Sequence, residues 1–251
     1  DSAWIFTSAT LSINGSFDHF TKLLGLEKAK TQYLQSPFNY NENAFLYVPK
    51  EIPDPKDELF NLVLVKKVLP LIKASKGRAF ILATSLKSMQ EIGALLKDEL
   101  KKNEIDYPVI TQGEGPKSDL LHQFKKHGNA VLIGSLSFWE GIDVRGPALS
   151  LVIIDKLPFQ SPGDPVFESK IKLLSDEGIN AFMSMQLPEA IIKLKQGVGR
   201  LIRDDHDKGV MVICDKRLIE KSYGIKIWKS LPAFKRTRNE SAVINFLEEL
   251  E

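Results

Sequence analysis

The sequence has 251 residues, of which 43% are hydrophobic and 26% charged, enough for one large domain or two small ones. With 34 Lys and Arg and 32 Asp and Glu, the formal net charge is +2. The protein is therefore not a general polycation, and any surface that binds nucleic acid must be local. The single Cys214 excludes an internal disulfide and a multi-cysteine metal site. We expect a reducing, cytoplasmic setting and no membrane partner, since no apolar run reaches transmembrane length.

The first residues, "DSAWIFTSATL", lack both an initiator Met and the pattern of a signal peptide. They predict a strand over 3–10 cut from the middle of a longer protein, so we expect a fragment. A short helix over 16–26 follows. The Pro-rich stretch 49–58 is typical of a connection between an N-terminal piece and the main body.

The main body alternates short apolar strands with amphipathic helices. The predicted strands are 43–49, 78–85, 107–113, 130–135, 149–159 and 209–215. The predicted helices are 57–75, 85–103, 118–128, 165–178, 188–203 and 240–251, and Pro70 is expected to bend or end the first. This alternation predicts an α/β fold, a parallel sheet covered by helices on both faces.

Polar residues follow several of these strands, at 83–85, 111–113, 134–143 and 155–159. In such folds, ligands gather at the carboxyl ends of the strands. Hydroxyls, amides and glycine backbone at neighbouring strand ends suit phosphate groups, although they are equally ordinary turn chemistry.

The segment "QGVGRLIR", 196–203, carries one amide and two guanidinium groups. If it is helical, Gln196, Arg200 and Arg203 form one stripe opposite an apolar side. That side consists of Leu194, Val198, Leu201 and Ile202. Each helical glycine costs about 1 kcal/mol relative to alanine, which indicates that something approaches the backbone there. Paired guanidinium forks suit a polyphosphate better than a carboxylate, and a solvated helix face is the alternative.

Four segments resemble, in order, helicase motifs III to VI of the superfamily 2 DNA helicases of the DinG/XPD (Rad3-like) type. They are "TSATL" (7–11), "FILATS" (80–85), "GSLSFWEGIDVRG" (134–146) and "QGVGRLIRD" (196–204). The segments "IIDKLPFQSPGDP" and "SYGIKIWKSLPAF" are similar to this group too. The resemblance covers nearly the whole chain and is closest to the bacterial DinG/YoaA branch. It implies a RecA-like sheet of the P-loop NTPase type.

The family's nucleotide-binding elements are missing from the sequence. "GEGPKS" (113–118) is no P-loop, because one residue separates its glycines and a proline precedes its lysine. The four iron–sulfur cysteines of the family are also missing, although a cluster is possible in the full-length protein. The resemblance therefore implies a second RecA-like helicase domain over 41–251, with 1–40 as the motif III strand and tether of a first motor domain.

The resemblance also assigns roles in a 5′–3′ DNA helicase. ATP and Mg²⁺ would be bound mainly by the N-terminal domain of the same polypeptide. Arg200 and Arg203, with Gln196 nearby, would face the γ-phosphate as arginine fingers, so this chain alone should hydrolyse no ATP. Further nucleotide-side residues would be Glu140, Gly141 and Asp143, although Asp143 could equally cap a loop. Thr7, Ser8 and Thr10 of motif III would couple the two domains.

Single-stranded DNA is the expected partner. By resemblance, its sugar-phosphate backbone would be touched by Thr84, Ser85, Gln112, Gly113, Ser135 and Ser137. The segment 216–238 carries eight Lys or Arg and one acid, interleaved with Tyr223, Trp228 and Phe234. Such a segment could be a single-strand groove, a basic surface helix with inward aromatics, or a dock for a replication or repair protein.

Two other classes of function stay open on the sequence. The chain could be a non-catalytic RecA-like module that only grips nucleic acid or a partner. It could also be an unrelated doubly wound enzyme acting on a small phosphorylated metabolite.

Overall fold

The computed structural model describes residues 3–135, 138, 144, 148–160 and 163–250. Seven strands form one sheet in the order β3-β4-β2-β5-β6-β1-β7, and each neighbouring pair is parallel. The strands are β1 (Ala44–Tyr47), β2 (Ala79–Ala83), β3 (Val109–Thr111), β4 (Val131–Ser135), β5 (Leu151–Ile154), β6 (Gly209–Ile213) and β7 (Lys235–Thr237). The predicted α/β fold with a parallel sheet is confirmed.

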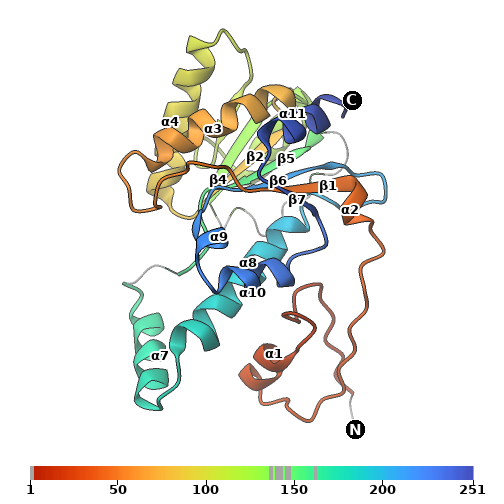
Figure 1. Cartoon of the computed structure of the whole chain (residues 1–251), viewed down its shortest axis with the longest axis vertical. Coiled ribbons are helices and arrows are strands. Elements are labelled where there is room, and N and C mark those ends of the chain that lie inside the picture. Colours follow the sequence, from red (N-terminus) through yellow and green to blue (C-terminus); the bar gives the residue numbers. More distant parts are fainter. Residues whose placement is uncertain (1–2, 136–137, 139–143, 145–147, 161–162, 251) are drawn as a thin grey trace.

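Helices cover both faces of this sheet (Figure 1). One layer holds α3 (Phe60–Ala74), α4 (Leu86–Lys102) and α11 (Glu240–Glu248). The opposite face packs against α5 (Lys117–His127), α8 (Leu187–Val198), α9 (Arg217–Glu220) and α10 (Gly224–Ser230). Strand residues alternate between the two layers: Phe80 and Leu82 join one core cluster, and Ile81 joins the other. Both faces are buried, so apolar strands without polar alternation are what the fold requires.

Local sequence explains where the helices begin and end. Ser85 caps α4 by accepting a hydrogen bond from the Ser88 N–H at 3.1 Å, and Asn239 caps α11 by accepting one from the Ala242 N–H at 3.3 Å. Gly128 ends α5 in the left-handed region, at φ 69°. Pro70 does not end α3, which continues to Ala74, because the apolar side of that helix is fully buried on both sides of the proline.

The N-terminal segment departs from the prediction. Residues 3–10 lie outside the sheet and form no strand, since no strand among the described residues pairs with them. The predicted short helix is present as α1 (Asp18–Leu23). Two hydrogen bonds and the packing of Ile13 against the core tie the segment to the helical layer. Lys195 Nζ donates to the Ser12 carbonyl at 2.8 Å, and Ser230 Oγ donates to Asn14 Oδ1 at 3.0 Å.

Among the residues that the structure describes, five short elements were not predicted. They are α2 (Tyr40–Asn43), a π-helix at Phe182–Gln186, α9, α10 and β7. None is long enough to show a hydrophobic period. β7 is three residues, two of them basic, and charge on a short edge strand discourages pairing with other chains.

Between β5 and β6, α7 (Pro165–Asp176) projects away from the sheet (Figure 1). Within the described part of the chain, no helix is long and apolar enough to cross a membrane.

Gly77 is predicted to be irreplaceable in the turn that leads from α3 into β2. Its φ is +88°, and a Cβ there would lie 2.1 Å from the backbone oxygen of Asn129. Gly77→Ala should lower the free energy of unfolding by about 2–4 kcal/mol. Urea unfolding measures this. The matched control is Gly115→Ala, where the nearest atom would be a Leu120 methyl at 3.8 Å; an equal loss in both variants would contradict the prediction.

Candidate functional site

The arginine segment is a turn rather than a helix. α8 ends at Val198, and the Arg200 N–H donates to the Gly197 carbonyl at 2.9 Å. The expectation of one helical stripe through Gln196, Arg200 and Arg203 is therefore wrong beyond Val198. Glycines at 197 and 199 weaken the helix at this point, and the chain must turn there to reach β6. Gln196 lies on the last turn of α8 and is half-buried.

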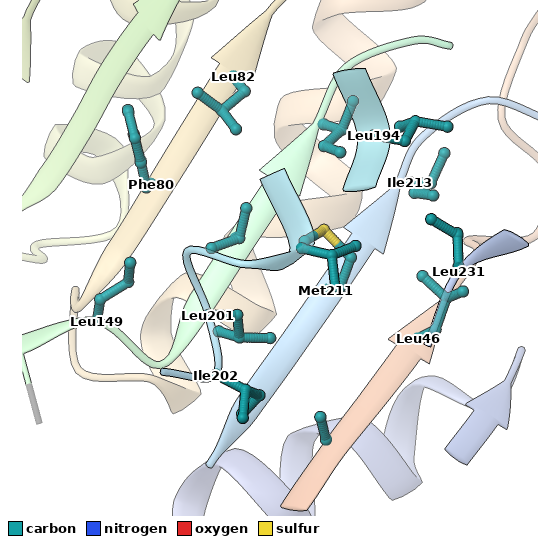
Figure 2. Packing of buried hydrophobic residues seen from close by; sticks show 14 of the residues in the cluster. Leu46, Phe80, Leu82, Leu149, Leu194, Leu201, Ile202, Met211, Ile213 and Leu231 are labelled. Carbon is teal, nitrogen blue, oxygen red and sulfur yellow. The ribbon is translucent and has the colours of Figure 1, made fainter. Parts of the chain in front are cut away.

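The apolar side of this segment is buried as predicted. Leu194, Val198, Leu201 and Ile202 are each at most 3% exposed. Figure 2 shows Leu201 and Ile202 beside the beginning of β6, whereas Leu194 lies near Ile213 at the far end of the strand. The two arginines flank the buried Leu201–Ile202 pair, so this packing fixes their backbone against the sheet.

A hydrogen-bonded loop holds the second arginine. Asp207 Oδ2 accepts from the Arg203 N–H at 2.8 Å and from the Asp204 N–H at 3.0 Å. Asn43 Nδ2, just before β1, donates to the Asp205 carbonyl at 3.0 Å. The arginine turn is thereby fastened to the amino ends of β1 and β6, the opposite edge from the one where ligands of such folds usually gather.

The side of the sheet at which its strands end, here called the carboxyl edge, brings together several residues predicted to contact DNA. Gln112 Oε1 accepts from both the N–H and the hydroxyl of Ser135, at 2.7 and 2.9 Å. This joins the ends of β3 and β4. Gly113 is exposed with φ +100°, in a turn closed by Glu114, whose carboxylate accepts from the Thr111 N–H at 2.9 Å. Glycine suits this backbone conformation.

The end of β2 is organised by a carboxylate that the sequence reading did not assign. Asp155 is fully buried, and it accepts hydrogen bonds from the Thr84 N–H (2.9 Å), the Thr84 hydroxyl (3.2 Å), the Ser88 hydroxyl (3.1 Å) and the Lys156 N–H (2.7 Å). The Thr84 hydroxyl is thus directed inward, and Ser85 is the exposed member of the predicted pair. The one feature of the sequence that could have indicated this role is the position of Asp155, a carboxylate directly after a buried strand.

Burial dominates the titration of this region. Desolvation raises the pKa of Asp155 to about 6, against the opposing effects of Lys156 and of the hydrogen bonds from Lys156, Thr84 and Ser88. Burial also raises the pKa of the Cys214 thiol well above its usual value, helped by Asp155 and Asp215. Cys214 is therefore a protonated core residue.

The end of β6 is closed by an ion pair. Asp215 is fully buried, and its Oδ2 lies 2.6 Å from an Arg217 terminal nitrogen and accepts from the Leu157 N–H at 2.8 Å. Burial lowers the pKa of Arg217, but the hydrogen bond and charge of Asp215 outweigh it and the net direction is upward. The guanidinium also lies over the Phe159 ring, 5.5 Å from its centroid. Arg217 is a structural residue here.

The aromatics of the basic segment pack inward. Phe234 is 4% exposed, and the Tyr223 ring lies 5.0 Å from that of Phe182. Trp228 packs partly against the core, with Arg236 over its ring at 4.8 Å. Of the three alternatives, this favours a basic surface with inward aromatics over a platform for stacked bases. Lys221, Lys226 and Lys229 are exposed.

The remaining predicted residues divide into two groups. Ser137, Glu140, Gly141 and Asp143 lie outside the described residues. Thr7, Ser8 and Thr10 form a small surface turn, with the Ser8 and Thr10 hydroxyls 3.1 Å apart. Across the portion that the structure describes, no group of three or more His, Cys, Asp or Glu side chains could hold a metal ion.

Residues 68–234 match the family model described as the helicase C-terminal domain. The chain is 47% identical over 248 residues to the ATP-dependent DNA helicase YoaA of Haemophilus influenzae, covering 99% of this chain and 38% of that protein. It is 35% identical over 244 residues to the ATP-dependent helicase DinG of Mycobacterium tuberculosis, covering 95% and 36%. The chain thus spans well under half the length of these relatives.

A solved structure described as XPD in its apo form has the same fold. The TM-score is 0.64 at 20% identity, over 88% of this chain and 46% of that one. The family match and the shared fold therefore agree on a RecA-like helicase module.

The buried Asp155 predicts a measurable pH dependence of stability. Its pKa of about 6 lies above the ordinary 3.8, so the folded state holds the proton more tightly than the unfolded state. The contribution of Asp155 to stability is therefore largest below about pH 4 and is lost as the pH rises through 6. Asp155→Asn keeps both backbone hydrogen bonds, and the Thr84 and Ser88 hydroxyls can accept from its amide. The variant should gain about 2 kcal/mol relative to wild type between pH 4.5 and 7.5.

Urea unfolding at both pH values measures this difference. The control is Asp98→Asn, on the exposed side of α4. Parallel pH profiles for wild type and Asp155→Asn would contradict the assignment.

Proposed function

Because the chain belongs to the helicase C-terminal domain family of DinG- and YoaA-like proteins, we propose that it is the second motor domain of an ATP-dependent 5′–3′ DNA helicase. The RecA-like module would be residues 41–251, with 1–40 as a tether that includes motif III. The observation that carries this proposal is the anchored arginine turn on a RecA-like sheet that brings no P-loop of its own.

In this proposal, Arg200 and Arg203 act on ATP held by a first motor domain. Guanidinium groups supply donors for phosphate oxygens and cannot ligate Mg²⁺, so the metal and most nucleotide contacts belong to the other domain. Mg²⁺ would neutralise charge on the β- and γ-phosphates there. The arginines would donate to the γ-phosphate only when the two domains close, with Gln196 close behind them. Whether the two domains are closed would then depend on whether the γ-phosphate is present.

Gly199 supports an external partner at this turn. It is exposed, has an ordinary helical φ of −65°, and an added Cβ would lie 3.7 Å from the nearest oxygen, that of Gln196. No contact within the described residues therefore requires glycine at this position. Close approach of a second body, such as the nucleotide-carrying domain, is a sufficient reason for it.

The N-terminal segment offers a second surface for that domain. Trp4 is 82% exposed, Ile5 85% and Leu34 75%. Large apolar side chains this exposed are candidates for an interface with another domain. We assign this surface to the first motor domain, with Thr7, Ser8 and Thr10 positioned to couple the two.

Single-stranded DNA would lie along the carboxyl edge. Ser85, Gln112 and Gly113 present hydroxyl, amide and backbone groups at neighbouring strand ends. Ser135 is buried and its hydroxyl donates to Gln112 Oε1, so it would position Gln112 rather than contact DNA itself. Such groups bind the sugar-phosphate backbone without reading sequence, as a translocating motor requires. The Thr84 hydroxyl, held by Asp155, would position this strand end rather than contact DNA itself.

A non-catalytic nucleic-acid-binding module is the second candidate function. It is favoured by the exposed Lys221, Lys226 and Lys229 beside α10, which need no nucleotide to attract phosphates. The two functions differ in one property: only a motor domain makes hydrolysis by the whole protein depend on Arg200.

In the full-length protein that contains this chain, Arg200→Ala should lower DNA-stimulated ATP hydrolysis by at least about 10³-fold. The reason is that an arginine finger raises the rate of phosphoryl transfer by a factor of about 10³ to 10⁵. Single-strand DNA affinity should change less than about threefold, since the arginine turn lies on the opposite edge. Arg200→Lys should not restore activity, because an ammonium cannot reproduce the forked geometry. Steady-state ATPase assays and fluorescence anisotropy measure the two properties.

Lys208→Ala is the matched control, an exposed cation in the same connection between α8 and β6. The 251-residue chain alone sets the baseline and should hydrolyse no ATP. An Arg200→Ala protein that hydrolyses ATP normally would exclude the arginine-finger role and leave the binding module as the better reading.

A further inference from the structure

A cavity of about 460 Å³ lies at the carboxyl edge of β1 and β7, where the proposed nucleotide and DNA residues do not reach. Its wall includes Tyr47 at the end of β1, the first turn of α11, and the side chains of Lys50, Lys67 and Arg238. Glu51 and Glu240 also line it. Three cations and a helix N-terminus thus surround one space.

Tyr47 is the buried polar group of this wall. The residue as a whole is 2% exposed, its side chain lines the cavity, and its hydroxyl is not hydrogen-bonded to another residue that the structure describes. A phenol hydroxyl that lines a cavity can donate a hydrogen bond to a ligand that enters it. Burial, followed by the charge of Glu240, raises the pKa of Tyr47 to about 12. The phenol therefore stays protonated and is a hydrogen-bond donor to whatever enters.

Lys50, Lys67 and Arg238 line the same cavity and differ in how far other groups already occupy them. Among the described residues Lys50 has no ion-pair partner, and it is exposed at the cavity mouth. Lys67 is paired with Glu51 at 3.1 Å, so these two charges largely cancel. Arg238 donates only long hydrogen bonds, both 3.4 Å, to the Val48 and Pro49 carbonyls. Most of its donor capacity is therefore available to the cavity.

The N-terminus of α11 completes the set of donors. The helix has nine residues, and Asn239 accepts from the N–H of Ala242. Glu240 and Ser241 of the first turn line the cavity. First-turn N–H groups and the positive end of the helix dipole attract anions.

We propose that this cavity binds a phosphate group of the DNA backbone. The Tyr47 hydroxyl, Lys50 and Arg238 donate to its oxygens. The chemistry itself is that of any phosphate oxyanion, and assigning it to DNA rests on the proposed function of the carboxyl edge. β1 lies three strand spacings from β2, or about 14 Å, so one strand a few nucleotides long spans Ser85 and the cavity.

The carboxylate of Glu240 gives the proposal a distinctive consequence. An acid in the first turn is favourable to the helix itself, but here it also faces the cavity and opposes an anion. Glu240→Gln should therefore tighten phosphate binding, whereas removing a donor should weaken it. A site for a cation predicts the reverse for both changes.

The test titrates the 251-residue chain with inorganic phosphate, followed by the amide NMR signals of residues 239–242. A labelled oligothymidylate is titrated in parallel by fluorescence anisotropy at low salt. Tyr47→Phe should weaken phosphate binding about five- to tenfold without lowering the urea midpoint, because the lost hydroxyl has no partner in the fold. Lys50→Ala should weaken oligothymidylate binding and reduce its salt slope by about one. Glu240→Gln should strengthen binding of both probes.

Tyr107→Phe and Lys66→Ala are the matched controls, since neither residue lines this cavity. Unchanged phosphate binding in Tyr47→Phe overturns the site. Loss of phosphate binding with unchanged oligothymidylate binding overturns the assignment to DNA. If wild type binds oligothymidylate but no variant alters it, the inference fails while the proposed function stands. If wild type binds no oligothymidylate at all, even at low salt, the proposed DNA role fails with it.

Discussion

The burial of both faces of one parallel sheet is the constraint on which the rest of this structure depends. Residues such as Ile81, Ile133 and Ile153 have no solvent contact, so the strands cannot carry polar chemistry along their length. Outside the edge strand β7, the polar groups of the sheet are confined to the two sides where its strands begin and end. A carboxylate that remains buried there must be satisfied by donors, as Asp155 is by four hydrogen bonds and Asp215 by its arginine and a backbone amide.

This confinement separates the two sets of candidate residues. The arginine turn lies at the amino edge, fastened to the beginnings of β1 and β6, and the DNA candidates lie at the carboxyl edge. Five residues of β6 separate the edges by about 16 Å. A close-packed sheet of this kind moves as one body, so a motor domain built on it would carry its DNA edge along whenever its arginine edge docks on a nucleotide.

The sequence predicted most of this fold because its strongest signals are local. Apolar runs such as 79–83 and 209–213 can only be buried strands when helices alternate with them, and Ser85 and Asn239 mark helix starts by their own chemistry. Predictions failed where the outcome depends on distant partners. The strand over 3–10 has no neighbouring strand to pair with, and α8 stops at Val198 because Leu201 and Ile202 must return to the sheet. Asp155 was missed as an organising group because nothing local shows that Thr84 and Ser88, some 70 positions away, point toward it.

The cavity beside Tyr47 depends on the same kind of distant pairing. β7 has three residues and no hydrophobic period, yet it lies in register with β1, with Lys235 opposite Phe45 across 190 positions of sequence. That pairing places Arg238 beside the Val48 carbonyl that follows β1, and it puts the start of α11 in the wall of the cavity that Tyr47 lines. A tyrosine in "AFLYVP" is an ordinary core residue until this edge strand is placed. The set of donors for an anion therefore arises from the order of the strands, and a substitution that displaces β7 would take Arg238 and the start of α11 away from Tyr47.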